Sequence, residues 1–201
     1  MKKQIIVIHG GETFDSYDKY IEYLKNFEME FERISSKSWK DTLAPELGDD
    51  YEIISPRMPN SLNAKYLEWK IWFDKLTPFF NPEVVLIGNS LGGIFLAKYL
   101  SENLFPKKII ATFLVAAPYD AEGTNDSLAD FVLQDDLTLL QKQSGVLRLY
   151  QSKDDMIVPP QNAEKYRAKL PQASITLLDG RGHFFQETFP EIIADIRKLL
   201  W

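Results

Sequence analysis

Short apolar runs alternate along this chain with longer stretches in which apolar residues recur with a helical period. The runs Ile5-Ile6-Val7-Ile8 and Val84-Val85-Leu86-Ile87 are continuously apolar, which is typical of strands buried on both faces of a sheet. Strands that alternate with helices indicate a parallel sheet covered by helices on both sides. The pattern predicts six strands, at residues 4–8, 51–55, 84–87, 109–116, 146–151 and 175–178.

The helical period predicts helices at residues 17–27, 38–47, 64–80, 91–103, 127–143, 161–170 and 190–200. Together these elements predict an α/β fold with three layers and a doubly wound, mainly parallel sheet of about six strands. No repeat or Gly/Ser-rich linker divides the chain, so we expect one domain over residues 1–201.

Two segments lack a regular pattern. Residues 28–37 read as a loop, and residues 118–126 form a polar loop after the fourth predicted strand. Loops at the carboxyl ends of parallel strands are where such sheets bind ligands. The predicted helix 127–143 would then form a small cap beside the site.

Composition narrows the function classes. The net charge of −6 is spread in mixed sign, which argues against a nucleic-acid or anionic-membrane partner. No apolar run approaches the roughly 20 residues of a membrane helix, and the short run after Met1-Lys2-Lys3 lacks a signal-peptide core, so we expect a cytoplasmic protein. The absence of cysteine excludes disulfides and a cysteine nucleophile, and two histidines offer no metal-binding pattern. We therefore expect neither a cofactor nor a metal.

The most informative motif is Gly88-Asn89-Ser90-Leu91-Gly92, which reads Gly-x-Ser-x-Gly directly after an apolar run. This pattern is typical of a nucleophile elbow, a sharp strand-to-helix turn that exposes the serine hydroxyl. Glycines on both sides leave room where the strand and the helix approach each other. The simpler alternative is that Ser90 only caps the following helix.

A serine nucleophile needs a base and a site for the oxyanion. His183 lies in a glycine-rich loop after the last predicted strand and is the candidate base. His9 ends the first strand and is followed by two glycines, an arrangement typical of an oxyanion hole, so we expect His9 to brace that loop. The backbone N–H groups of Gly11 and Leu91 are the predicted oxyanion donors, with the N–H of Glu12 as the second choice.

The acid that orients the base is expected after a strand between Ser90 and His183. Asp155 is preferred to its neighbour Asp154, because adjacent residues cannot both point at the histidine. Asp120, after the fourth predicted strand, is a further candidate. Adjacent carboxylates do not face each other across a substrate, so glycosidase chemistry by Asp154 and Asp155 is excluded.

These motifs, in this order, resemble the α/β-hydrolase superfamily along essentially the whole chain. The short length and the segment Met58-Pro59-Asn60 are similar to the small single-domain serine hydrolases related to retinoblastoma-binding protein nine. The resemblance implies a catalytic triad of Ser90, His183 and Asp155 with a minimal cap. The first loop, with His-Gly-Gly, and the longer connection over residues 28–50 depart from that subfamily.

The expected reaction is hydrolysis of an ester, thioester or amide of a small-molecule acyl substrate. Acyl transfer would use the same residues, and a protein of this fold can also bind a ligand without catalysis. Phe184 and Phe185 either line the pocket or pack in the core, whereas Trp69 and Trp72 are expected in the core. Neither the substrate nor the oligomeric state follows from the sequence.

Overall fold

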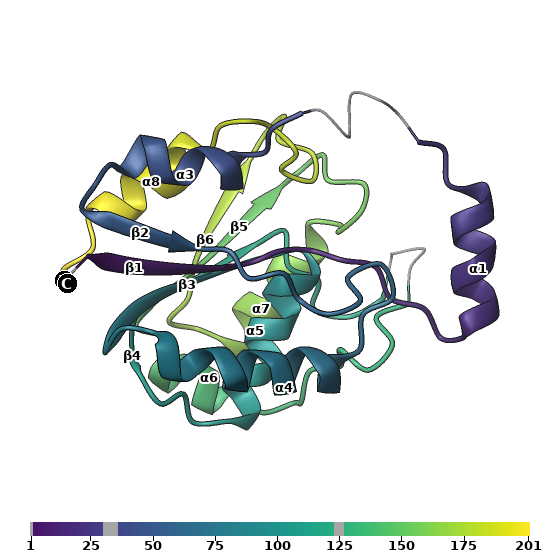
Figure 1. Ribbon diagram of the computed structural model, residues 1–201, viewed down its shortest axis with the longest axis horizontal. Helices are drawn as coiled ribbons and strands as arrows, with labels where there is room; N and C mark the ends of the chain where they lie inside the picture. The colour runs from purple at the N-terminus through teal and green to yellow at the C-terminus, as the bar shows by residue number, and fades with distance from the viewer. Residues whose placement is uncertain (1, 30–35, 123–126) are drawn as a thin grey trace.

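In the computed structural model, which describes residues 2–29, 36–122 and 127–201, six strands form one parallel sheet (Figure 1). The strand order is β2-β1-β3-β4-β5-β6. The predicted α/β fold and all six predicted strands are confirmed, each strand end lying within two residues of its predicted position. The strands are β1 (Lys3–Ile8), β2 (Tyr51–Ile54), β3 (Glu83–Asn89), β4 (Lys108–Val115), β5 (Val146–Ser152) and β6 (Ser174–Leu178).

Helices cover both faces of the sheet, because the buried strands are apolar on both sides. Ile6 and Ile8 point into the core under one helical layer, and Ile5 and Val7 point into the core under the other. One layer holds α4 (Tyr66–Leu76), α5 (Leu91–Glu102), α6 (Thr138–Gln143) and α7 (Gln161–Lys169). The other holds α3 (Trp39–Leu47) and α8 (Pro190–Arg197), on the opposite side of the sheet in Figure 1.

The strand order reverses between β1 and β3, which are neighbours at the centre of the sheet. The chain leaves β1 toward the edge strand β2, while β3 is followed by strands that build the sheet in the other direction. Ligands bind parallel sheets of this kind in the crevice at such a switch point, outside the carboxyl ends of the strands. In this protein the two carboxyl ends are Ile8 and Asn89.

The predicted helix over residues 127–143 is wrong before Thr138, where α6 begins. Tertiary contacts hold the earlier part in an irregular path. Phe131 is fully buried, and Ala129 has a positive φ of 46°, which no helix accommodates. The carboxylate of Asp130 accepts a hydrogen bond from the backbone N–H of Tyr66 at 3.0 Å, so it caps α4 instead of continuing its own helix.

The remaining predicted helices are present with shorter ends. The predicted helix 64–80 is α4 followed by a 3₁₀ turn, Thr77–Phe79. Helix α1 (Tyr17–Asn26) buries no residue and stands apart from both layers (Figure 1). The predicted loops 28–37 and 118–126 lie partly outside the described residues. Within the described ranges no helix is both long and apolar enough to cross a membrane.

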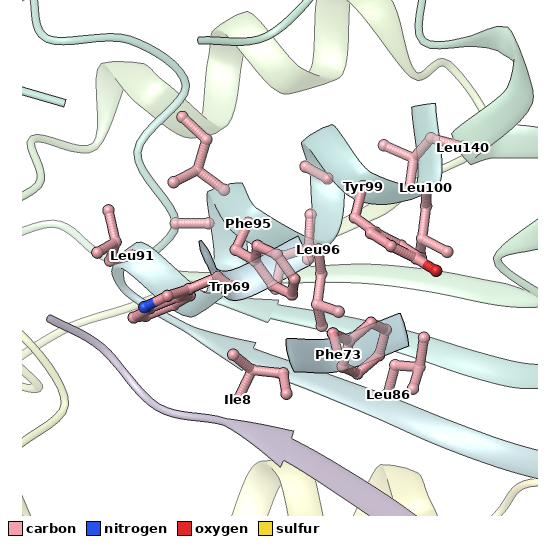
Figure 2. Packing of buried hydrophobic residues seen from close by; sticks show 14 of the residues in the cluster. Ile8, Trp69, Phe73, Leu86, Leu91, Phe95, Leu96, Tyr99, Leu100 and Leu140 are labelled. Atoms are coloured by element: carbon pink, nitrogen blue, oxygen red, sulfur yellow. The ribbon is translucent and has the colours of Figure 1, made fainter. Parts of the chain in front are cut away.

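Helix α4 presents one tryptophan to the core and one to solvent. Trp69 is fully buried and packs edge-on against Phe95 (Figure 2). It also packs edge-on against Phe131 and donates its indole N–H to the carbonyl of Pro59 at 2.8 Å. The prediction that Trp72 lies in the core is wrong, because this side chain is 43% exposed. The buried face of α4 is made by Tyr66, Trp69 and Phe73. At about 100° per residue, Trp72 lies beyond the edge of that face, on the side of Trp69 away from the other two.

Substitution of the two tryptophans tests which face of α4 is buried. Trp69→Ala is expected to lower the free energy of unfolding by about 3–5 kcal/mol, because it leaves a cavity among aromatic rings. Trp72→Ala, on the same helix, should change the free energy of unfolding by no more than about 0.5 kcal/mol. Urea denaturation measures both values. Equal losses from the two substitutions would contradict the assignment of the buried face.

Candidate active site

Ser90 occupies the turn between β3 and α5 in a strained backbone conformation. Its φ of 54° and ψ of −121° lie in a region that residues with a Cβ rarely adopt. The backbone N–H of Ser90 donates to the carbonyl of Val115 at 2.8 Å, which anchors the turn to β4. The Ser90 hydroxyl makes no capping hydrogen bond to α5. The simpler interpretation of Ser90 as a helix cap therefore fails, and its hydroxyl is available for chemistry.

The two glycines of the motif permit this turn. A Cβ on Gly88 would lie 2.4 Å from the carbonyl oxygen of Gly92. A Cβ on Gly92 would lie 2.3 Å from the carbonyl oxygen of Ile8, at the end of β1. Both distances are far inside van der Waals contact with backbone atoms that cannot move away. Helix α5 can therefore start directly above the ends of β1 and β3 only with glycine at these positions.

Ser90 opens into a cavity of about 260 Å³ at the switch point of the sheet. This volume lies just below the roughly 300–1,000 Å³ typical of ligand pockets, so the cavity has room for a small ligand only. Gly10 forms the wall beside the serine, since a Cβ there would lie 3.1 Å from the Ser90 Cβ. The lining residues are Gly10, Gly11, Glu12, Thr13, Lys40, Asn89, Ser90, Leu91, Pro118, Ser127, Leu128, Ile157, Val158, His183 and Phe185.

His183 also lines this cavity and is held by Asp155. The His183 Nδ1 lies 2.9 Å from one carboxylate oxygen of Asp155 and 3.2 Å from the other. That carboxylate is buried and also accepts hydrogen bonds from the backbone N–H groups of Ile157 and Val158, both at 2.9 Å. Because Asp155 accepts the proton of Nδ1, the other ring nitrogen, Nε2, remains able to accept a proton.

The two alternative acids do not contact the His183 ring. Asp154 accepts hydrogen bonds from the Ser152 hydroxyl and from the backbone N–H of Gly182, so it holds the loop that carries the histidine. These hydrogen bonds, that of Ser152 first, lower the pKa of Asp154. Asp120 pairs with Lys165 at 2.7 Å. Of the three candidates, only Asp155 is positioned to orient His183.

Gly11 and Leu91 line the cavity beside Ser90. Their backbone N–H groups donate to no acceptor within the described parts of the chain. The N–H of Glu12, the second choice from the sequence, donates to the carbonyl of Ser61 at 2.8 Å and is therefore occupied. The hydrogen bonds of the described residues include none between the Ser90 hydroxyl and His183. Bonds of this kind are often long in the free enzyme and tighten when substrate binds.

His9 braces the first loop and does not line the cavity. Its Nδ1 donates to the carbonyl of Gly10 at 2.5 Å, its Nε2 accepts from the backbone N–H of Met58 at 2.9 Å, and its ring packs edge-on against Trp69. The pKa of His9 is lowered, mainly because burial disfavours the charged imidazole. The hydrogen bond to Gly10 raises this pKa, and the charge of Lys40 lowers it.

The lowered pKa of His9 predicts a loss of stability in mild acid. The unfolded chain takes up a proton at His9 near pH 6.5, and the folded protein takes it up only at a lower pH. The free energy of unfolding should therefore fall as the pH drops from about 7.5 to about 5. Urea denaturation of the wild-type protein and of His9→Gln isolates this contribution, since all other titratable groups are shared. Their difference in stability should shrink toward pH 5, and a constant difference would contradict the prediction.

The two phenylalanines after His183 have different environments. Phe184 is buried and packs against Phe189 at a centroid distance of 5.0 Å, on the face of the sheet covered by α3 and α8. Phe185 is 61% exposed, lines the cavity and packs edge-on against the His183 ring. Of the two interpretations from the sequence, core packing therefore applies to Phe184 and cavity lining applies to Phe185.

Sequence reasoning missed Lys40, which lines the cavity and donates to the side chain of Asn89 at 3.0 Å. One signal was present in the sequence. Lys40 follows Trp39 at the start of a predicted helix, where acidic residues are favoured and a cation is unfavourable.

Comparison with known proteins identifies the family of this chain. A family model described as serine hydrolase matches residues 31–191. No curated protein shows significant sequence similarity to the chain. The ydeN gene product of B. subtilis superposes with a TM-score of 0.76 and 18% identity, over 98% of this chain and 97% of that one.

Two further structures share the fold at lower similarity. The esterase domain of a Rhodothermus marinus protein has a TM-score of 0.61 and 18% identity, over 92% of this chain and 80% of that one. A serine hydrolase from Cycloclasticus zankles has a TM-score of 0.63 and 14% identity, over 98% of this chain and 89% of that one. With the family match spanning most of its length, the chain belongs to the serine hydrolase family and has the α/β-hydrolase fold.

Proposed function

We propose that this hydrolase cleaves a carboxylic ester, thioester or amide through an acyl-enzyme on Ser90, with His183 as the base and Asp155 as the acid that orients it. The observation that carries the proposal is the arrangement around one cavity. It joins a strained serine with an unengaged hydroxyl to a histidine whose Nδ1 is held by a buried carboxylate. Each group has the role that acyl transfer requires.

In the first half of the reaction, His183 Nε2 takes the proton of the Ser90 hydroxyl as the serine oxygen attacks the substrate carbonyl carbon. Asp155 stabilises the imidazolium that forms, through the hydrogen bond to Nδ1. The carbonyl oxygen becomes negatively charged, and the N–H groups of Gly11 and Leu91 donate to it. Donors of this kind contribute roughly 2.7–4 kcal/mol each to transition-state stabilisation in other enzymes.

His183 then acts as an acid. It gives its proton to the leaving oxygen, sulfur or nitrogen as the carbonyl reforms, which releases the first product and leaves the acyl group on Ser90. A water molecule then loses a proton to His183 and attacks the acyl carbon. Collapse of the second intermediate returns the proton to Ser90 and releases the carboxylic acid. The small cavity supports acyl groups of few carbons.

A fluorophosphonate probe tests the proposal directly, because it reacts only with an activated serine. The native protein should become labelled, and peptide mass spectrometry should locate the adduct on Ser90. Heat-denatured protein is the control for non-specific reaction and should stay unlabelled. Native protein that remains unlabelled, or that carries the adduct on another serine, would contradict the proposed nucleophile.

A further inference from the structure

Lys40 places an ammonium group in the same cavity as Ser90. It is the second residue of α3, and its Nζ donates to Asn89 Oδ1 at 3.0 Å. Asn89 directly precedes Ser90 and is buried, and its side-chain NH₂ reaches back to the carbonyl of Val115 at 3.5 Å. The amide is thus held from both ends, with its oxygen toward Lys40. The ammonium has a fixed position beside the nucleophile.

The described part of the chain supplies no carboxylate that forms an ion pair with this ammonium. Within the described residues, Lys40 takes part in no ion pair. The carboxylate of the adjacent Asp41 instead caps α3, where it accepts from the backbone N–H and the hydroxyl of Ser38 at 2.8 Å. The ammonium also lies 5.4 Å from the centre of the Trp39 ring.

This position is unfavourable for the helix and for the charge. A cation in the first turn of a helix opposes the helix dipole, and partial burial without a counter-ion disfavours the charge. Burial accordingly lowers the pKa of Lys40, while the charge of Asp41 raises it. An ammonium carries three donors, and Asn89 uses one of them. Two donors remain for a group that enters the cavity.

We propose that Lys40, positioned by Asn89, binds a carboxylate of the substrate, so that the enzyme acts on acyl compounds that carry a carboxylate near the scissile carbonyl. This inference rests on the proposed function, because it assigns the substrate class of the same site. A carboxylate matches the single positive charge and the small volume of the cavity. A phosphate monoester carries about −1.5 to −2 charges near pH 7, more than one ammonium balances.

The proposal is tested with two pairs of substrates that differ only in charge. Monoethyl glutarate is compared with the ester in which an amide replaces its free carboxylate, and para-acetoxybenzoate with para-acetoxybenzamide. The first pair places the charge on the acyl side, and the second on the leaving-group side. The wild-type enzyme should have the higher kcat/KM for the charged member of at least one pair.

Lys40→Met should lower that ratio of kcat/KM values by about tenfold to a hundredfold, the range expected for a hydrogen bond between charged groups. Lys37→Met is the matched control, because it removes the same charge from an exposed residue three positions earlier and should leave the ratio unchanged. Lys40→Gln serves as a second neutral variant if the methionine variant does not fold. A ratio that is unchanged in a folded Lys40 variant overturns the proposal.

A binding measurement separates this proposal from the catalytic one. Calorimetry of glutarate with Ser90→Ala protein needs no turnover, and adding Lys40→Met should weaken that binding at least tenfold. If such Lys40-dependent binding occurs in a protein whose native form resists the fluorophosphonate probe, the carboxylate site stands and the proposed reaction fails. If esters are hydrolysed but Lys40→Met leaves the affinity for glutarate unchanged, the reaction stands and the carboxylate site is wrong.

Discussion

Ser90→Ala is expected to lower kcat for ester hydrolysis by about a thousandfold to a millionfold, the range found when the nucleophile of other serine hydrolases is removed. The substitution deletes only the hydroxyl, which makes no capping hydrogen bond to α5. The fold should therefore persist while covalent chemistry stops. Initial rates with a short-chain activated ester, measured beside a urea denaturation curve, check both statements. Activity that survives in a folded Ser90→Ala protein would exclude Ser90 as the nucleophile.

Ser90→Gly provides a companion measurement of the strain in the turn. Glycine accepts a positive φ without the steric penalty of a Cβ, and strained conformations of this kind cost roughly 1–3 kcal/mol. Part of that gain is offset by the greater entropy of glycine in the unfolded chain. We expect Ser90→Gly to be more stable than Ser90→Ala and equally inactive. A glycine variant less stable than the alanine variant would show that the strain at this position is smaller than the entropic cost of glycine.

Asp155→Asn is expected to lower kcat by about a thousandfold to ten-thousandfold, as in other enzymes with a Ser-His-Asp triad. Asparagine keeps the size of the side chain, but its NH₂ group can donate toward His183 Nδ1 and favour the tautomer in which Nε2 carries the proton. Nε2 could then no longer accept the proton of Ser90. The same change also removes the negative charge that stabilises the imidazolium.

The neighbouring acids supply the controls for this prediction. Asp154→Asn and Asp120→Asn make the same chemical change at carboxylates that do not contact the His183 ring. Each should lower kcat by less than about tenfold, through small shifts of a loop or a surface ion pair. A larger loss in Asp154→Asn or Asp120→Asn than in Asp155→Asn would assign the acid to that residue instead.

The sheet brings together residues that lie far apart in the sequence. β1 and β3 are neighbours, so the loop with Gly10 and Gly11 ends beside the turn with Ser90. β5 and β6 are also neighbours, and Asp155 and His183 follow their carboxyl ends. The loops that carry Asp155 and His183 are joined further by the hydrogen bonds of Asp154 and Ser152. A parallel sheet alone therefore gathers all these loops on one edge.

The strands were predictable because they depend on local signals, and the turn that carries Ser90 depends on local signals too. Continuous apolar runs identify strands buried on both faces, whichever helices cover them. Gly88 and Gly92 around Ser90 mark a turn whose sterics involve the residues of the motif itself and the strand beside it. The preference for Asp155 over Asp154 followed from the same local geometry, since neighbouring side chains point in different directions.

Contacts between residues far apart in the sequence decided the features that the sequence pattern did not predict. The segment before α6 has the composition of a helix, but Asp130 caps α4 and Phe131 enters the core, so that segment is not helical. Trp69 and Trp72 have the same side chain, and only the packing face of α4 separates the buried ring from the exposed one. The backbone N–H of Glu12 donates to Ser61, so it is not free to bind an oxyanion. The ammonium of Lys40 is held at the cavity by its hydrogen bond to Asn89. The local sequence pattern shows which chemical groups the chain has. The partners of these groups depend on how distant segments pack across the sheet, and no short stretch of sequence contains that information.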